Sequence, residues 1–266
     1  MRILIGQHGA QADQVVLLFG LGLLGSSIES SLLGAGYVHR ETVAFNWTDP
    51  TSWPTALRPI EDHCRSRAPR RISVSWTAGG QGFSCTEDEA RLEIESLMAV
   101  LGMIEDLRRS PGPERLDFHF VSSAGGLFEG QRVVDWSSAP SPLRPYGHLK
   151  LRQEELLRDN FDDHELSIYR PSTVYGPMAQ KPHHGLINNL VNDGLRGRST
   201  TLDAHVMSLR DYVYCSDIGA FISRRIKSPE VGYTGSPIHF LVSARCSSIF
   251  EVVRTIERVL HLKIRY

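Results

Sequence analysis

Tyr146 and Lys150 are the two residues whose types and spacing most directly suggest chemistry. Segment 145–150 is predicted to be helical, which places the two side chains at i and i+4 on one face. A free phenol titrates near pH ~10, and a nearby lysine ammonium favours the phenolate. Such a pair could move a proton on and off a substrate hydroxyl. The same spacing is common on solvated helix faces, so the interpretation depends on the elements around it.

The composition indicates a folded protein with a large core. The chain has 266 residues, of which 41% are hydrophobic and 22% charged, and its formal net charge is −1. This length suits one large domain, or one and a half, and the composition argues against disorder. Nucleic-acid binding through bulk charge is disfavoured, because the near-neutral chain shows no basic stripe.

The cysteines and the N-terminus bear on metals and location. Four cysteines are scattered without metal-ligand spacing, so we expect neither a metal site nor a disulfide framework; they are Cys64, Cys85, Cys215 and Cys246. The N-terminus lacks a signal peptide's apolar core, and the longest apolar run, Val15 to Leu24, is too short to cross a bilayer. A cytoplasmic protein without a membrane partner is therefore expected.

A glycine-rich turn follows the first predicted buried strand. Val15–Phe19 is a continuous apolar run, and Gly20, Gly22 and Gly25 follow it as Gly-x-Gly-x-x-Gly. A helix over Ser26–Leu33 and a strand over Thr42–Phe45 come next. The glycines permit a tight turn and close approach of a pyrophosphate, which the helix N-terminus would attract. The context favours dinucleotide binding over a merely structural loop.

The residue expected to bind the adenosine ribose is altered. Asn46 stands at the end of the second predicted strand, where a carboxylate usually takes the ribose hydroxyls. Asn46 can still hydrogen-bond a hydroxyl, and its neutrality lowers the penalty for a 2′-phosphate. No arginine follows directly to bind such a phosphate, so the choice between NAD and NADP stays open.

The rest of the chain alternates strands and helices. The predicted strands are Arg71–Trp76, Leu116–Val121, Leu166–Arg170, Ser199–Leu202, Arg210–Tyr214 and Ile238–Ser243, and the predicted helices are Pro54–Arg67, Glu87–Arg109, one from Tyr146 through Leu157, His184–Leu195, Ser216–Arg225 and Ser247–Leu260. This order predicts an α/β fold, a Rossmann-type doubly wound parallel sheet with a smaller C-terminal lobe. We expect a dinucleotide-binding domain over residues 1–176 and an interleaved, mixed α/β substrate-binding lobe over 177–266.

Four motifs in order resemble a known family. They are the glycine fingerprint, Ser122-Ser123 at a strand end, the Tyr146/Lys150 helix with Glu154, and Arg170 through Tyr175-Gly176-Pro177. Together with the segment from Arg210 to Asp217, they resemble the extended short-chain dehydrogenase/reductase superfamily, specifically the NAD-dependent epimerase/dehydratase family. The chain departs from the family pattern at Asn46 and Thr173, and residues 48–71 lack a full strand with the usual Gly-Asp element.

The resemblance implies roles for particular residues. Tyr146 would be the acid/base, Lys150 would lower the pKa of that tyrosine and bind the nicotinamide ribose, and Ser123 would bond the substrate oxygen, with Ser122 as the fallback. Cofactor contacts are implied for Gly20, Gly22, Leu23, Leu24, Gly25, Asn46, Ala78, Gly79, Ser122, Tyr146, Lys150, Pro171 and Thr173, and substrate contacts for Ser123, Ala124 and Arg210. Arg210 would hold a diphosphate, because its planar guanidinium suits phosphate oxygens.

Three functions follow in order of preference. The first is an NAD(P)-dependent epimerase, dehydratase or reductase of a nucleotide-sugar, working as a homodimer. The second is an NAD(P)H-dependent reductase of another small carbonyl compound with the same Tyr146/Lys150 pair. The third is a non-catalytic dinucleotide-binding protein with an eroded site. The serines could instead cap a strand end, and Arg210 could instead pair with Asp211 or another carboxylate.

Overall fold

A seven-stranded sheet forms the centre of the larger body of the protein. The computed structural model describes residues 1–8, 11–79, 82–109, 113–177, 185–202, 204–228 and 236–266. The strand order is β3-β1-β2-β4-β5-β6-β9. The bounds are β1 (Arg2–His8), β2 (Gln11–Phe19), β3 (Val38–Thr42), β4 (Arg71–Trp76), β5 (Arg115–Val121), β6 (Leu166–Pro171) and β9 (Ile238–Leu241).

Five of these strands run parallel. β2, β4, β5, β6 and β9 pair in that order, so their carboxyl ends lie along one edge of the sheet. The loops that follow Phe19, Trp76 and Val121 therefore meet at this edge, which is where open α/β sheets bind ligands. The predicted Rossmann-type doubly wound sheet is confirmed for this part of the chain.

The N-terminal strand β1 was not predicted, and it changes the other edge of the sheet. β1 pairs antiparallel with β2 on one side and with β3 on the other, so it separates two strands that α1 connects. The prediction of a strand over Thr42–Phe45 is wrong in position, because β3 ends at Thr42. Residues 48–70 contain no strand, as expected, so nothing there carries a Gly-Asp element.

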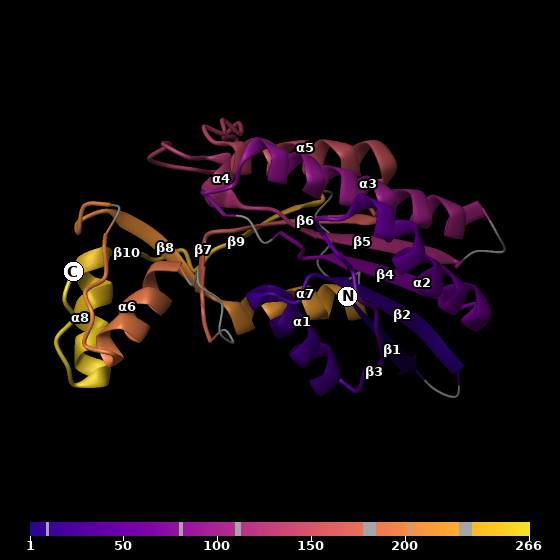
Figure 1. Ribbon diagram of the computed structural model, residues 1–266, viewed down its shortest axis with the longest axis horizontal. Coiled ribbons are helices and arrows are strands. Elements are labelled where there is room, and N and C mark those ends of the chain that lie inside the picture. The colour runs from indigo at the N-terminus through magenta and orange to yellow at the C-terminus, as the bar shows by residue number, and fades with distance from the viewer. Residues whose placement is uncertain (9–10, 80–81, 110–112, 178–184, 203, 229–235) are drawn as a thin grey trace.

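Helices cover both faces of the sheet (Figure 1). On one face lie α2 (Trp53–Arg67), α3 (Glu87–Arg109), α4 (Ala124–Leu127) and α5 (Pro145–Asn160), and on the other lie α1 (Leu23–Gly34) and α7 (Cys215–Lys227). A short 3-10 helix, η1 (Pro50–Ser52), precedes α2. Each face buries its own apolar cluster, around Phe118 and Ile104 on one side and around Leu18 and Ile222 on the other.

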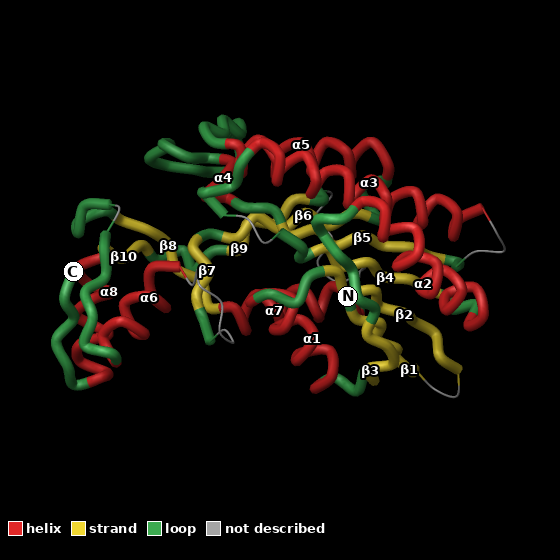
Figure 2. Tube along the Cα trace, in the orientation of Figure 1, coloured by secondary structure: helices red, strands yellow, loops and turns green. Residues whose placement is uncertain are grey.

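A smaller body lies at one end of the molecule (Figure 2). It contains β7 (Thr173–Tyr175), β8 (Leu209–Tyr214) and β10 (Cys246–Ser248) in a three-stranded sheet, together with α6 (Gly185–Leu195) and α8 (Ile249–Leu260). Ser248 begins α8 through a reciprocal capping box with Glu251. α7 and β9 return to the larger body, so the chain after Pro177 contributes to both. The assignment of 1–176 and 177–266 as functional domains stays a prediction.

The expected strand over Ser199–Leu202 does not form. Ser199 makes only an isolated parallel bridge with Arg265. His184, the first residue of one predicted helix, lies outside the described residues, and α6 begins at Gly185. None of the described helices is both long enough and apolar enough to span a membrane.

Candidate active site

The glycine loop between β2 and α1 is packed tightly against the loop after β4. Gly20 has φ +88°, and a Cβ there would lie 2.4 Å from the backbone nitrogen of Ala78. A Cβ on Gly25 would lie 1.9 Å from the Gly20 carbonyl oxygen. The Thr77 hydroxyl donates to the same oxygen at 2.6 Å. The positive φ and the two close approaches explain why glycine is needed at positions 20 and 25.

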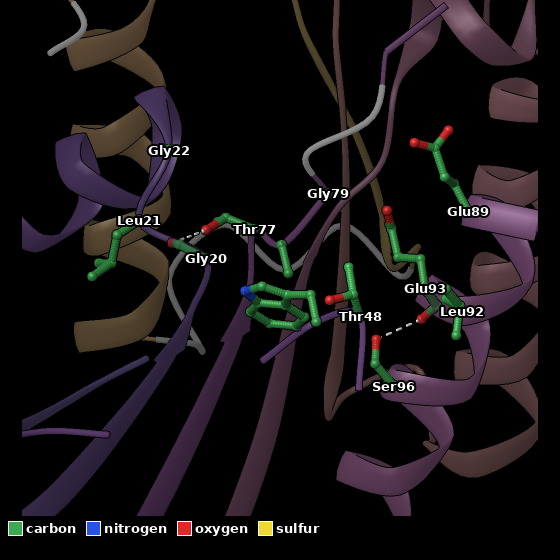
Figure 3. A pocket seen from close by; sticks show the side chains of 12 residues that line it. Gly20, Leu21, Gly22, Thr48, Thr77, Gly79, Glu89, Leu92, Glu93 and Ser96 are labelled. Atoms are coloured by element: carbon green, nitrogen blue, oxygen red, sulfur yellow. Dashed lines mark hydrogen bonds between the residues drawn. The ribbon is translucent and has the colours of Figure 1, made fainter. Parts of the chain in front are cut away.

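A pocket opens between this loop and α3 (Figure 3). It is a cavity of about 220 Å³, and its lining residues are Gly20, Leu21, Gly22, Trp47, Thr48, Thr77, Ala78, Gly79, Glu89, Leu92, Glu93 and Ser96. In Figure 3 the glycine loop forms one wall and Glu89, Leu92, Glu93 and Ser96 of α3 form the opposite wall.

The pocket fits a dinucleotide at the glycine loop. A Cβ built on Gly22 would meet nothing within 4 Å, so its backbone faces open space. Gly22 is also the N-cap of α1 and leaves the first backbone N–H groups of the helix without a side-chain cap. Free N–H groups at a helix N-terminus attract phosphate oxygens. Leu23 and Leu24 lie in this first turn of α1.

The part of the pocket next to residues 46–48 differs from a usual adenosine-binding site. The Asn46 side-chain oxygen accepts hydrogen bonds from the Thr48 backbone nitrogen at 3.2 Å and the Thr48 hydroxyl at 2.9 Å. This turn places Trp47 and Thr48 on the pocket wall, and the Trp47 ring packs edge-on against Trp76 with centroids 5.7 Å apart. A contact of Asn46 with the cofactor stays a prediction.

Tyr146 and Lys150 lie one turn apart on α5, as predicted. Pro145 at the first helical position begins the helix with a favourable φ. Lys150 is 3% exposed, and its ammonium nitrogen lies 5.8 Å from the centroid of the Tyr146 ring. Tyr146 is half-buried and packs on Phe83, with ring centroids 5.7 Å apart. A buried cation beside a partly accessible phenol is the arrangement that proton transfer would require.

Two side chains hold the ammonium of Lys150. Its nitrogen donates to Glu93 Oε1 at 3.1 Å and to Gln153 Oε1 at 3.0 Å. Gln153 Nε2 donates to the same Glu93 oxygen at 3.0 Å, which closes a ring of three hydrogen bonds. Burial alone would lower the pKa of Lys150, but the Glu93 carboxylate, with a smaller contribution from Tyr146, raises it overall.

The two serines after β5 have different surroundings. Ser123 Oγ accepts the Gly126 backbone N–H at 3.1 Å and so caps the short helix α4, leaving its own proton free to donate. Ser122 is 3% exposed, and its hydroxyl donates to Glu154 Oε1 at 2.6 Å. Both serines therefore have structural contacts, and the cofactor and substrate roles assigned to them stay predictions.

The remaining predicted site residues lie on α4, β6, β7 and β8. Ala124 begins α4, Pro171 ends β6, and Thr173 begins β7. Arg210 is exposed on β8 and makes no ion pair with any residue in the described part of the chain. Its neighbour Asp211 instead accepts hydrogen bonds from the Ser243 hydroxyl at 2.7 Å and the Ser243 backbone nitrogen at 3.0 Å.

The sequence interpretation missed the α3 wall of the pocket. Glu93 continues the helical stripe of the buried residues Leu97, Val100, Ile104 and Leu107 at intervals of three and four. A carboxylate on an apolar stripe is a signal that it has a buried partner. That partner, Lys150, is remote in the sequence. Within the described residues, no group of three or more His, Cys, Asp or Glu could hold a metal ion.

Comparisons with known proteins agree with this geometry. Residues 73–240 match the family model "NAD dependent epimerase/dehydratase family". A Bacillus subtilis (strain 168) protein described as "Uncharacterized UDP-glucose epimerase YtcB" is 30% identical over 145 residues, which are 53% of this chain and 44% of that protein. The match thus spans less than half the length of that relative.

Solved structures share the fold across most of this chain. The UDP-glucose 4-epimerase of Thermus thermophilus in complex with NAD is 20% identical, with a TM-score of 0.68 over 95% of this chain and 85% of that one. MoeE5 in complex with UDP-glucose and NAD is 25% identical, with a TM-score of 0.66 over 93% of this chain and 82% of that one. Because the family model matches well over half of its residues, the chain belongs to the NAD-dependent epimerase/dehydratase family.

Proposed function

We propose that the protein is an NAD-dependent epimerase of a nucleotide-sugar, with Tyr146 as its acid/base. The observation that carries this proposal is the half-buried Tyr146 one helical turn from the buried ammonium of Lys150, beside the pocket of the glycine loop. A phenol held near a cation gives up its proton more readily than one in water. The pair is therefore suited to remove a proton from a sugar hydroxyl and return it.

Each residue has one task in this mechanism. When bound, the nicotinamide would supply the hydride chemistry, taking a hydride from the sugar carbon and returning it to the opposite face of that carbon. The Tyr146 phenolate accepts the hydroxyl proton and later returns it. The Lys150 ammonium stabilises the phenolate. Ser123 donates its free proton to the substrate oxygen as charge develops there. Ser122 is less suited to this task, because Glu154 already accepts its proton.

NAD suits the pocket better than NADP does. The residues that line the described part of the pocket include neither lysine nor arginine. A 2′-phosphate would carry further negative charge into this region without a cation to pair with it. The structures of the UDP-glucose 4-epimerase and MoeE5 quoted above were solved with NAD, which supports the same choice.

The substrate proposed is a UDP-sugar. The names of the relative and of both solved structures include UDP-glucose, and Arg210 offers an exposed guanidinium without an ion-pair partner in the described residues. A planar guanidinium binds two phosphate oxygens at once. We propose that Arg210 binds the diphosphate of the substrate. We also propose that the enzyme works as a homodimer, and a monomer in light scattering would contradict this.

The test of the acid/base role is Tyr146→Phe. The purified protein would be incubated with a panel of UDP-sugars and NAD, and epimer formation would be followed by chromatography. The variant should lose at least ~100-fold in kcat, because general acid–base catalysis contributes on that order, while cofactor binding stays near that of the wild type. Full activity in the variant would refute the proposed mechanism.

Two controls accompany this experiment. Tyr266→Phe removes an exposed phenol far from α5 in the sequence and should leave turnover unchanged. The absorbance of the reduced nicotinamide separates the alternatives. An epimerase recycles its cofactor and shows no net change, whereas a reductase of another carbonyl compound consumes NADH in proportion to product. No turnover with any substrate would favour a dinucleotide-binding protein that is not catalytic.

A further inference from the structure

Glu93 is a buried carboxylate for which the family resemblance gave no role. It comes from α3, and its Oε1 lies 3.1 Å from the ammonium nitrogen of Lys150 on α5. The Glu93 side chain is 9% exposed and that of Lys150 is 4% exposed. An ion pair in such surroundings is poorly screened by solvent, so each charge acts strongly on its neighbours.

The pair is held in place from three sides. Gln153 bonds both partners at 3.0 Å. The Phe120 ring of β5 lies under the ammonium, with 5.4 Å from the nitrogen to the ring centroid. A Cβ on Gly79 would lie 3.3 Å from both Glu93 Oε1 and Lys150 Nζ, so the loop after β4 covers the pair. In Figure 3 Glu93 extends from α3 into the region of Gly79, on the pocket wall.

The hydrogen bonds of Lys150 leave one proton available. A lysine ammonium has three N–H donors, and Glu93 and Gln153 each accept one of them. The third N–H is the one that could reach a cofactor hydroxyl or the phenol of Tyr146. Glu93 and Gln153 therefore fix the direction in which the remaining N–H points.

We propose that Glu93 is a positioning residue of the acid/base pair. Its carboxylate, together with Gln153, orients the ammonium of Lys150. The carboxylate also offsets the charge of that ammonium, so that the Tyr146/Lys150 pair is active at a higher pH than it would be without Glu93. This inference rests on the proposed function of Tyr146 and Lys150. It adds that the working pH of the site is set from α3, outside the motif that carries the two residues.

The direction of the pH effect follows from the charges around Lys150. The groups that act on it are Glu93 and, more weakly, Tyr146 and Cys85, and Cys85 in turn is influenced by Glu89. Without the Glu93 charge, the buried ammonium would be destabilised and would lose its proton at lower pH. The limb of the pH profile that reports Lys150 therefore moves toward acid.

The experiment is the pH profile of kcat/KM for the wild type and for Glu93→Gln with NAD and UDP-glucose. Glutamine keeps the size of the side chain and an oxygen that can accept from Lys150, and it removes only the charge. The limb that reports Lys150 should move to lower pH by about one unit, the lower end of shifts caused by a charge within ~4–6 Å. Superimposable profiles would overturn the proposal.

Two further variants separate charge from structure. Glu93→Asp keeps the charge and should restore a profile close to that of the wild type. Glu95→Gln removes a charge from the same helix at a side chain that pairs with Arg91 at 3.0 Å and is 39% exposed, and it should leave the profile unchanged. If Glu93→Gln lost activity without any shift in pH, Glu93 would have a structural role only, which would also overturn the proposal.

A measurement without substrate covers the case in which the variants do not turn over. Acetic anhydride modifies neutral amines, and peptide mass spectrometry reads the modification at each lysine. At pH 8, Lys150 should be modified faster in Glu93→Gln than in the wild type, because loss of the carboxylate leaves more of the buried amine neutral, while Lys263, whose side chain is 81% exposed, should be modified at the same rate in both proteins. Equal rates at Lys150 in the two proteins would mean that Glu93 does not hold its charge. This readout needs no substrate, so it can fail or succeed independently of the proposed function.

Discussion

Glu154 and Arg170 form a buried ion pair beneath the candidate site. Arg170 donates to Glu154 Oε1 at 2.9 Å and to Oε2 at 2.6 Å, and the two side chains are 6% and 2% exposed. The Ser122 hydroxyl completes the group. These contacts connect the end of β5, α5 and the end of β6, so they hold in place the elements that carry Ser123 and Tyr146.

Glu154→Ala should lower the free energy of unfolding by about 3–5 kcal/mol, because it leaves the Arg170 guanidinium buried without its partner. The measurement is urea unfolding followed by circular dichroism. The neighbouring Glu155→Ala is the matched control, since Glu155 pairs with Arg152 at 3.2 Å on an exposed face. That variant should lose about 1 kcal/mol or less. Equal losses in the two variants would contradict the role of burial.

The sequence could predict residues whose chemistry is local and could not predict partners brought together by folding. Tyr146 and Lys150 are four positions apart, and helical geometry places them together. Glu93 lies 57 positions from Lys150, and only the packing of α3 against α5 makes them neighbours. The hydrogen bond from Ser122 to Glu154 likewise depends on how α5 lies over β5.

At the scale of elements, the N-terminal end of α1 is fixed by contact with the glycine loop, whereas the position of Gly34 at its C-terminal end is open. A Cβ on Gly25 would press on the Gly20 carbonyl and lie 2.7 Å from the Thr77 hydroxyl oxygen. A Cβ on Gly34 would meet nothing within 4 Å. The same substitution at the two ends of one helix therefore separates packing from helix propensity.

Gly25→Ala should destabilise the protein by about 1–3 kcal/mol through overpacking, and should weaken NAD binding because the loop must move. Gly34→Ala should stabilise it by about 0.5–1 kcal/mol, since alanine loses less backbone entropy in a helix. Thermal unfolding and isothermal titration with NAD measure the two effects. Unchanged NAD affinity in Gly25→Ala would argue against this loop as the cofactor site.

The strand β1, which was not predicted from the sequence, shows that local patterns do not determine strand pairing. Consecutive strands joined by a helix are usually neighbours in the sheet, so β3 would ordinarily pair with β2. Instead β1 lies between them and runs antiparallel to both. Which strand pairs with which depends on long-range hydrogen bonding. The helix α3, whose apolar stripe is long and regular, was predicted with its observed bounds, Glu87–Arg109.

At the scale of the whole molecule, three titratable residues lie on strands of the central sheet. Asp117 and His119 are on β5, and His239 is on β9. Burial, with a smaller effect of Arg225, lowers the pKa of His239 to about 4. Burial also lowers the pKa of His119, although Asp117 acts in the opposite direction. Burial would raise the pKa of Asp117, but His119 and Arg71 outweigh it and hold that pKa well below its usual range. Both histidines therefore bind a proton less readily in the folded protein than in the unfolded chain.

These shifts predict that the protein loses stability in acid in two stages. Between pH 6.5 and about 4 the unfolded chain binds a proton at His239 that the folded chain does not, so the free energy of unfolding falls as pH falls, and the lowered pKa of His119 acts in the same direction. Below the ordinary aspartate range, protonation of Asp117 removes a further contribution, because its pKa in the folded protein is depressed.

His239→Phe should reduce the first stage. Phenylalanine keeps an aromatic ring against Tyr169, whose centroid lies 5.5 Å from that of His239, and it removes the group that titrates. From pH 7 to pH 5 the variant should lose roughly 1 kcal/mol less than the wild type, allowing for partial solvent screening of this half-buried side chain. Urea unfolding across pH measures the difference. His164→Gln, at an exposed position, should keep the wild-type slope. A slope in His239→Phe as steep as that of the wild type would mean that His239 is already protonated when folded, and the acid sensitivity would then arise elsewhere.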